Sequence, residues 1–138
     1  FAMLGVGIAL EESGAVALIA SSVAPHLAGI SPFFLLLAVF LMTSALTEIV
    51  TNNAVAVVMT PIAIGIGQSL GIDPRPLVVA VMVGASASFS TPIGYQTNTL
   101  VYGPGGYKFT DFARIGIGMN LIYAITCSLL IPVFWPFG

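Results

Sequence analysis

A polar tripeptide, Thr51-Asn52-Asn53, separates two apolar stretches that are each long enough to approach the middle of a membrane. The stretches 31–50 and 54–70 carry one charged side chain between them, Glu48. In hydrocarbon each polar group without a partner costs several kcal/mol, so a membrane chain keeps such a break only where protein or an aqueous cavity satisfies it. Such breaks usually hold an ion or a solute, and the tripeptide therefore indicates a transporter.

The composition is that of an integral membrane protein. Of the 138 residues, 58% are hydrophobic and 6% are charged, whereas a soluble domain carries roughly a quarter charged residues. We expect an all-α protein that crosses the cell membrane several times. Three basic residues against five acidic ones form no basic patch, which excludes nucleic acid as a partner. With one histidine and no credible nucleophile set, the sequence does not indicate an enzyme.

Proline, glycine and the few charges divide the chain into four expected membrane segments. They cover residues 1–29, 32–70, 76–107 and 114–137. The first segment is interrupted at Glu11–Gly14 and at Pro25-His26, so it is either two short helical pieces or one span with an interfacial turn. We expect the four segments to form a single transport domain. Because the chain begins within an apolar pattern, we expect it to be a fragment of a longer protein.

Residues 32–70 are too long for one straight helix across a membrane. At about 1.5 Å per residue such a helix would reach about 58 Å, whereas the hydrocarbon core is ~30 Å thick. Asn and Thr offer the backbone local hydrogen bonds that compete with a helix, so Thr51-Asn52-Asn53 is the natural place for a break. We expect a re-entrant helical hairpin with its tip at Asn52; a polar loop between two full spans is the alternative.

A second break is expected in the third segment, at residues 90–99. Pro92 removes a backbone donor there, and Gly94 permits backbone conformations that other residues avoid. The sequence therefore predicts a discontinuous transmembrane helix; a proline kink patched by hydroxyl groups is the alternative. The last segment is expected to be an ordinary spanning helix, with Trp135 at its far interface.

The two breaks together predict a binding site. A helix broken inside a membrane exposes N–H groups, which attract anions, at one new end and carbonyl groups, which suit a hard cation, at the other. The arm that begins near Ala54 would direct its N–H groups at the hairpin tip. Glu48, four residues before Asn52, either anchors the hairpin through hydrogen bonds or handles an ion or a proton. Further oxygen ligands for a small cation are available from Thr51, Thr91, Thr97, Asn98 and Thr99.

At these residues the chain resembles the divalent-anion/sodium symporter family, the permeases for sulfate, dicarboxylates and citrate. The first break, Thr47-Glu48-Ile49-Val50-Thr51-Asn52-Asn53-Ala54, is similar to a Thr-Glu-x-x-Ser-Asn-Thr-Ala stretch at a hairpin tip of that family. The second, residues 91–103, is similar to a later proline-rich break that ends in Asn and is followed by Tyr-Gly. The resemblance covers nearly the whole chain. It implies the second of two inverted repeats, the C-terminal half of a permease.

The resemblance also implies which residues bind solutes. Sodium is expected to bind Thr51, Asn52, Gly94, Gln96 and Asn98. The anion is expected to meet Asn52, Asn53, Tyr95, Gln96 and Thr97. The family usually has Thr at position 53, and residues 94–97 replace an Ala-Thr-Pro-Pro run that is common in dicarboxylate carriers. The sequence of this chain at residues 94–98 is more similar to that of members linked to sulfate and other inorganic anions.

The function that the resemblance implies is sodium-coupled symport of a small divalent anion, such as sulfate or a dicarboxylate. Sodium would offset the charge of the anion, and no cofactor other than this coupling ion is expected. The implied partners are the lipid bilayer, the N-terminal repeat of the same permease and a second copy in a homodimer. Two alternatives stay open. One is a proton-coupled or metalloid/anion transporter of the same superfamily, and the other is a membrane structural subunit that transports nothing.

Overall fold

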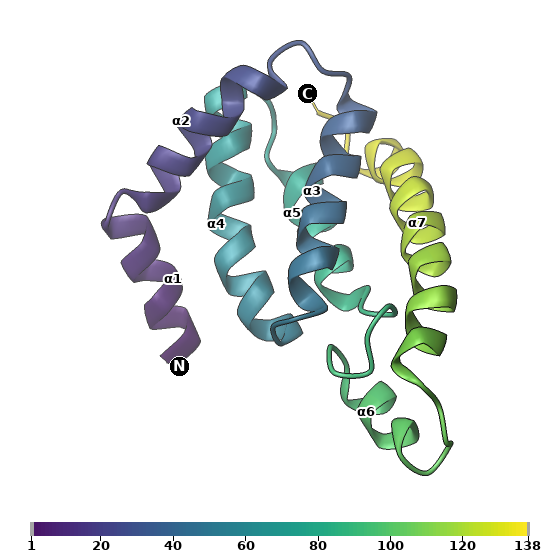
Figure 1. Cartoon of the computed structure of the whole chain (residues 1–138). Helices are drawn as coiled ribbons and strands as arrows, with labels where there is room; N and C mark the ends of the chain where they lie inside the picture. The colour runs from purple at the N-terminus through teal and green to yellow at the C-terminus, as the bar shows by residue number, and fades with distance from the viewer. Residues whose placement is uncertain (1, 138) are drawn as a thin grey trace.

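Residues 2–137 of the chain are described by a computed structural model (Figure 1), and every regular element among them is an α-helix. The helices are α1 Ala2–Glu12, α2 Ala15–Leu27, α3 Pro32–Thr47, α4 Asn52–Leu70, α5 Arg75–Ser86, α6 Gln96–Tyr102 and α7 Phe109–Phe134. The expectation of an all-α fold is therefore confirmed.

Two of these helices, α4 and α7, are long and apolar enough to cross a membrane. Helices α1 and α2 meet at an angle of 66° and make a third candidate span if the bent pair crosses as one unit. Gly14 lies in that bend with φ +74°, a left-handed conformation that glycine adopts without strain. The apolar helices α3 and α5, with 16 and 12 residues, are shorter than a full span.

The core lies between α3, α4 and α5, and α2 and α7 pack on its sides (Figure 1). The side chains that fill it are apolar and almost completely buried: Leu36, Val39, Met59, Ala63, Ile66, Leu77 and Val81. Helices α3 and α4 run antiparallel, and their connection lies at the same end of the bundle as the C-terminal end of α5. This packing brings the two helix breaks to one end of the core.

The first break lies earlier in the chain than the sequence predicted. Helix α3 ends at Thr47 and α4 begins at Asn52, so the non-helical residues are 48–51 rather than 51–53. Thr51 has an extended backbone (φ −61°, ψ 144°) and directly precedes the first turn of α4. Asn and Thr are disfavoured inside helices but favoured at helix starts, which explains why Asn52 opens a helix here. The expected tip at Asn52 is therefore wrong by a few residues.

The second break is shifted in the same direction. Residues 87–95 are non-helical, whereas the expected interruption was 90–99. Residues 96–99 instead form the first turn of α6, in which the N–H of Thr99 donates to the carbonyl oxygen of Tyr95 at 3.2 Å. The polar character of residues 96–99 indicated a loop, but a short helix satisfies their backbone groups.

Two further expectations differ from the structure. Pro25 does not interrupt the first segment, since it lies in the last turn of α2, where it removes one backbone hydrogen bond. The last helix begins at Phe109 rather than at residue 114. The carboxylate of Asp111 accepts a hydrogen bond from the backbone N–H of Lys108 at 2.8 Å and so closes its first turn.

Candidate functional site

The two helix breaks form one polar cluster that contacts the middle of α7. Residues 47–48 at the end of α3 make hydrogen bonds to residues 88–91 of the second break. The α7 residue that reaches both of them is Asn120, which lies 11 residues after the start of that helix and 14 before its end. Groups from three separate parts of the sequence therefore meet inside an otherwise apolar bundle.

Glu48 is the centre of this cluster, and its side chain is 7% exposed. The backbone N–H of Ser90 donates to Oε1 and that of Thr91 donates to Oε2, each at 2.8 Å. The side-chain amide of Asn120 also donates to Oε1, at 3.0 Å. The hydroxyls of Thr91 and Ser88 lie 2.9 and 3.3 Å from Oε2. A carboxylate with this many donors is a strong acceptor site, and it fixes the start of the second break against the hairpin tip.

Helix α3 also satisfies the carbonyl groups at the end of α5, which have no partner within their own helix. The hydroxyl of Ser44 donates to the carbonyl oxygen of Ala87 at 2.8 Å. The hydroxyl of Thr47 lies 2.9 Å from the carbonyl oxygen of Ala85 and 2.6 Å from Oδ1 of Asn52. Thr47 therefore connects the end of α5 with the first residue of α4.

Gly94 lies so close to the hairpin tip that no larger residue fits. A Cβ atom at this position would overlap the hydroxyl oxygen of Ser88 and would approach the carbonyl oxygen of Thr47 to 2.9 Å. The backbone of the second break can therefore rest on the backbone of residues 47–48 only because position 94 has no side chain.

Two polar residues of α6 hold the second break in shape. The side-chain amide of Asn98 donates to the carbonyl oxygens of Ser88 and Thr91, at 3.2 and 3.0 Å. The hydroxyl of Thr99 donates to the carbonyl oxygen of Pro92 at 2.7 Å. These bonds satisfy carbonyl groups that the non-helical backbone leaves without partners.

Helix α7 closes the cluster on its third side, and the sequence reasoning missed its contribution. A Cβ atom at Gly116 would overlap the backbone of Phe89, so α7 approaches the break only because this residue is glycine. The amide of Asn120 donates to Ser90 Oγ at 2.9 Å as well as to Glu48. A lone Asn within the apolar run 115–136 was the signal that would have found it, since polar residues inside membrane helices are rarely without a function.

The residues expected to bind sodium and the anion lie on the two breaks and on the helix starts that follow them. Asn52, Gly94 and Asn98 are partly buried within the cluster. The other expected residues are exposed at its edge: Thr51, Asn53, Tyr95, Gln96 and Thr97. The structure thus brings the second break to the hairpin tip, with three of the residues inside the cluster and five at its rim.

The arrangement presents two kinds of binding group. The first backbone N–H groups of α4, from Asn52 onward, have no partner within the helix, and they carry partial positive charge. The carbonyl and hydroxyl oxygens of the two breaks, among them those of Thr47, Ser88 and Thr91, carry partial negative charge. An anion and a small cation could therefore bind side by side, each attracted by a different part of the backbone.

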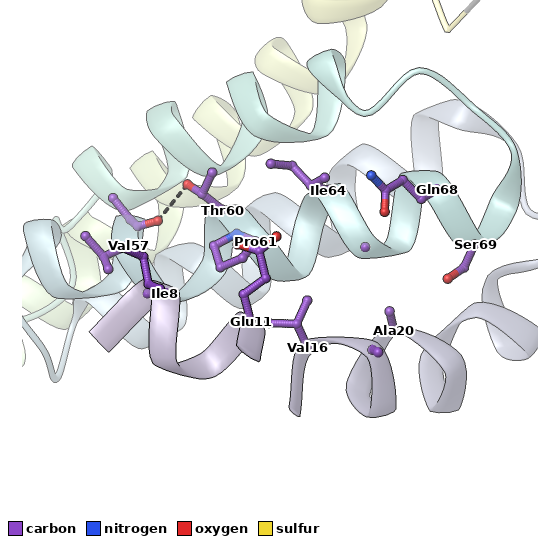
Figure 2. A pocket seen from close by; sticks show the side chains of 14 residues that line it. Ile8, Glu11, Val16, Ala20, Val57, Thr60, Pro61, Ile64, Gln68 and Ser69 are labelled. Carbon is purple, nitrogen blue, oxygen red and sulfur yellow. Dashed lines mark hydrogen bonds between the residues drawn. The ribbon is translucent and has the colours of Figure 1, made fainter. Parts of the chain in front are cut away.

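The described residues form two notable cavities, and the smaller of them adjoins this cluster. The larger, of about 650 Å³, lies between α1, α2 and α4, and in Figure 2 the side chains of Glu11 and Val16 point toward α4. The smaller, of about 330 Å³, lies between the second break, α6 and α7. Asn98 lines the smaller cavity. The remaining expected site residues line neither of these two cavities. Five of them are exposed at the edge of the buried cluster rather than inside a cavity.

Comparison with known proteins gives a family and several relatives. The pattern of the citrate transporter (CitMHS) family matches residues 1–137. The chain is 47% identical over 133 residues to an uncharacterized transporter of Synechocystis, which covers 96% of the chain and 22% of that protein. It is 37% identical over 131 residues to sodium/sulfate cotransporter 1 of Chlamydomonas reinhardtii, covering 94% of the chain and 15% of that protein.

A third relative is the sodium-dependent dicarboxylate transporter SdcS of Staphylococcus saprophyticus. The chain is 27% identical to it over 108 residues, which cover 78% of the chain and 21% of that protein. The chain therefore spans about a fifth or less of the length of these relatives.

Proposed function

Because the chain belongs to the citrate transporter family, we propose that it is part of a sodium-coupled symporter for a small divalent anion. The family consists of membrane transporters and not enzymes. The observation that carries the proposal is the hydrogen-bonded contact between the two helix breaks at Glu48. Discontinuous helices with juxtaposed ends are the arrangement by which secondary transporters bind an anion and a cation together.

In this proposal the α3–α4 hairpin is re-entrant. Its tip is level with Asn120 of α7, and from there α7 continues for about 16 Å in one direction and about 21 Å in the other. The open end of the hairpin is level with the end of α7, since the N–H of Asp73 donates to the carbonyl oxygen of Phe137 at 3.3 Å. If α7 crosses the bilayer, the hairpin enters from one face and turns back near the middle.

Sodium and the anion would occupy adjacent parts of the cluster. Thr51 and Asn52 would hold sodium together with backbone oxygens near Gly94 and Gln96 and with Asn98. The anion would meet the N–H groups at the start of α4 and the side chains of Asn52, Asn53, Tyr95, Gln96 and Thr97. Sodium would offset the anion's charge and so raise its affinity, which couples the two solutes in one transport step.

Sulfate is the anion that the comparisons favour. The chain is 37% identical to a protein named as a sodium/sulfate cotransporter and 27% identical to one named as a dicarboxylate transporter. Residues 94–97 and Asn53 also favour sulfate, because they differ from the residues that are common at these positions in dicarboxylate carriers. A dicarboxylate is the second candidate.

The site is incomplete within this chain. Asn53, Tyr95, Gln96 and Thr97 are exposed at the edge of the cluster, and the chain spans 15% of the sulfate cotransporter that it resembles. We infer that an N-terminal inverted repeat of the same permease completes the site, and that two permeases form a homodimer. The cluster and the anion would then move together relative to the rest of the protein.

The test is uptake of radiolabelled sulfate by the full-length permease in proteoliposomes. We expect an inward sodium gradient to drive uptake, and replacement of external sodium by choline to abolish it. Uptake that persists in choline and follows a proton gradient would support the proton-coupled alternative. If the protein neither takes up nor binds sulfate, succinate or arsenite, the result would support the alternative of a structural subunit that transports nothing.

A further inference from the structure

We propose that Asn120 of α7 is a positioning residue for the sodium and anion site. It fixes the carboxylate of Glu48 and thereby sets the apparent affinity for sodium, without contacting either solute. The inference rests on the proposed function, since it concerns the same site. It adds α7 to the site, a helix that lies outside both breaks and outside the two sequence motifs.

The hydrogen bonds of Asn120 connect all three parts of the cluster. Its Nδ2 atom lies 3.0 Å from Oε1 of Glu48, at the hairpin tip, and 2.9 Å from Oγ of Ser90, in the second break. An amide nitrogen carries two hydrogens. One Asn120 side chain therefore donates simultaneously to both breaks, which are 42 residues apart along the chain.

The acceptor atom of the Asn120 side chain indicates that the residue serves as a hydrogen-bond donor. Oδ1 of Asn120 is buried and has no hydrogen-bond partner among residues 2–137. A buried acceptor without a partner is unfavourable, and a leucine of similar size would avoid it. The side chain thus has an unfavourable acceptor that is offset only by its two donated hydrogen bonds, to Glu48 and Ser90.

Glu48 transmits the position of Asn120 to the expected sodium ligands. Its two carboxylate oxygens accept the backbone N–H groups of Ser90 and Thr91, and its own carbonyl oxygen lies 2.9 Å from the hydroxyl of Thr91. That hydroxyl accepts the backbone N–H of Gly94 at 3.1 Å. A rotation of the Glu48 side chain would therefore displace the backbone oxygens near Gly94, and oxygen positions determine how well a site fits a small cation.

The geometry of α7 makes this contact a rigid one. Gly116 lies one helical turn before Asn120 and lets the helix pack directly on the backbone of Phe89. The ring of Tyr123, on the same helix, packs against the ring of Phe89 with centroids 5.3 Å apart. Since Asn120 lies between these two contacts, its amide is held at a fixed distance from the break.

The experiment measures sulfate uptake by the full-length permease in proteoliposomes as a function of sodium concentration. For Asn120→Leu, which keeps the number and branching of the side-chain heavy atoms and removes both donors, we expect the half-saturating sodium concentration to rise at least about fivefold. The maximal rate per molecule should stay within about twofold of the wild type. Ser128→Ala is the matched control, since Ser128 is a buried residue of α7 whose hydroxyl donates to Ala124 of the same helix; both parameters should be unchanged.

A second variant and a second measurement keep the inference testable if Asn120→Leu is poorly produced. Asn120→Asp has the same size but places an acceptor against Oε1 of Glu48, so it should raise the half-saturating sodium concentration too. In purified protein, hydrogen exchange of the Ser90 and Thr91 amides should be at least about tenfold faster in either variant than in wild type.

The possible outcomes separate this inference from the function it rests on. Wild-type uptake that does not depend on sodium would overturn both. Sodium-driven wild-type uptake, together with an unchanged half-saturating concentration in Asn120→Leu and Asn120→Asp, would overturn the positioning role alone. A fall in maximal rate without a change in sodium affinity would also overturn it, because a purely structural residue has that signature.

Discussion

The carboxylate of Glu48 accepts a hydrogen bond from the backbone N–H of Thr91 at 2.8 Å, although the two residues are 43 positions apart. The bond joins the end of one interrupted helix to the non-helical segment that follows another. Glu48 is only 7% exposed, so little water reaches this contact, and the carboxylate is the acceptor that satisfies the N–H of Thr91. Glu48 is therefore the anchor of the hairpin, which is one of the two interpretations that its sequence position allowed.

Replacement of Glu48 should destabilise the protein strongly. Glu48→Ala leaves the N–H groups of Ser90 and Thr91 without acceptors, at a cost of about 1–3 kcal/mol each. We expect a drop in the thermal unfolding temperature of the purified full-length permease in detergent. Glu12→Ala, at an exposed glutamate of α1, is the control and should leave it unchanged. Equal melting temperatures for the two variants would contradict the anchoring role.

A methyl group at Gly94 should separate the two breaks. In Gly94→Ala the new Cβ overlaps Ser88 and presses on the carbonyl oxygen of Thr47, so the second break must move away from the hairpin tip. We expect sulfate uptake to fall at least about tenfold while the protein still reaches the membrane, as measured by surface labelling. Gly103→Ala, where a Cβ meets no atom within 4 Å, is the matched control. Normal uptake by Gly94→Ala would show that the close contact is dispensable.

The same comparison can be made within α7, at two glycines two residues apart. A Cβ at Gly116 overlaps the backbone of Phe89, whereas a Cβ at Gly118 meets nothing within 4 Å. We expect Gly116→Ala to lower the unfolding free energy by about 1–3 kcal/mol, as overpacking does, and Gly118→Ala to leave it unchanged or slightly raised. Thermal unfolding of the two purified variants checks this. Similar melting temperatures would argue against tight packing of α7 on the break.

At the other end of the hairpin, Arg75 should control the titration of Asp73. Hydrogen bonds from the Arg75 side chain (2.7 Å) and backbone (2.9 Å) lower the pKa of Asp73 below its ordinary value. The pair therefore stabilises the fold at neutral pH, and its contribution disappears as the pH falls through the lowered pKa. In Arg75→Gln the pKa should rise toward the ordinary value, as followed by carbon NMR of labelled aspartate. Because Arg75 is exposed, uptake should be unaffected. An unchanged pKa would contradict the interaction.

Local sequence was sufficient to predict that the chain is helical and that two polar interruptions occur in it. The break after Thr47 and the break before Gln96 both follow from residue types that compete with a helix, namely Thr, Asn, Pro and Gly. The positions of the breaks were less well predicted. Asn52 is favoured both in a turn and at a helix start, so the tripeptide alone could not decide whether it closes one helix or opens the next.

The composition of the cluster depended on contacts that local sequence does not encode. The partners of Glu48 lie about 40 to 72 residues away, and Asn120 belongs to a helix with ordinary apolar character. The close approaches at Gly94 and Gly116 likewise become visible only when the helices are packed. The sequence thus indicated where a site would be, and tertiary structure added the residues that hold it together.

The most direct test of the sodium site is sulfate uptake by Asn52→Ala under a sodium gradient. Asn52 begins α4, and its Oδ1 lies 2.6 Å from the hydroxyl of Thr47, so its side chain is directed into the cluster. Thr60→Ala is the control, since Thr60 is on the same helix and its hydroxyl bonds to Ala56 within it. We predict that Asn52→Ala reaches the membrane in normal amounts, as Thr60→Ala does, but loses sodium-driven uptake. Uptake by Asn52→Ala at the wild-type rate, with wild-type dependence on sodium, would contradict the account.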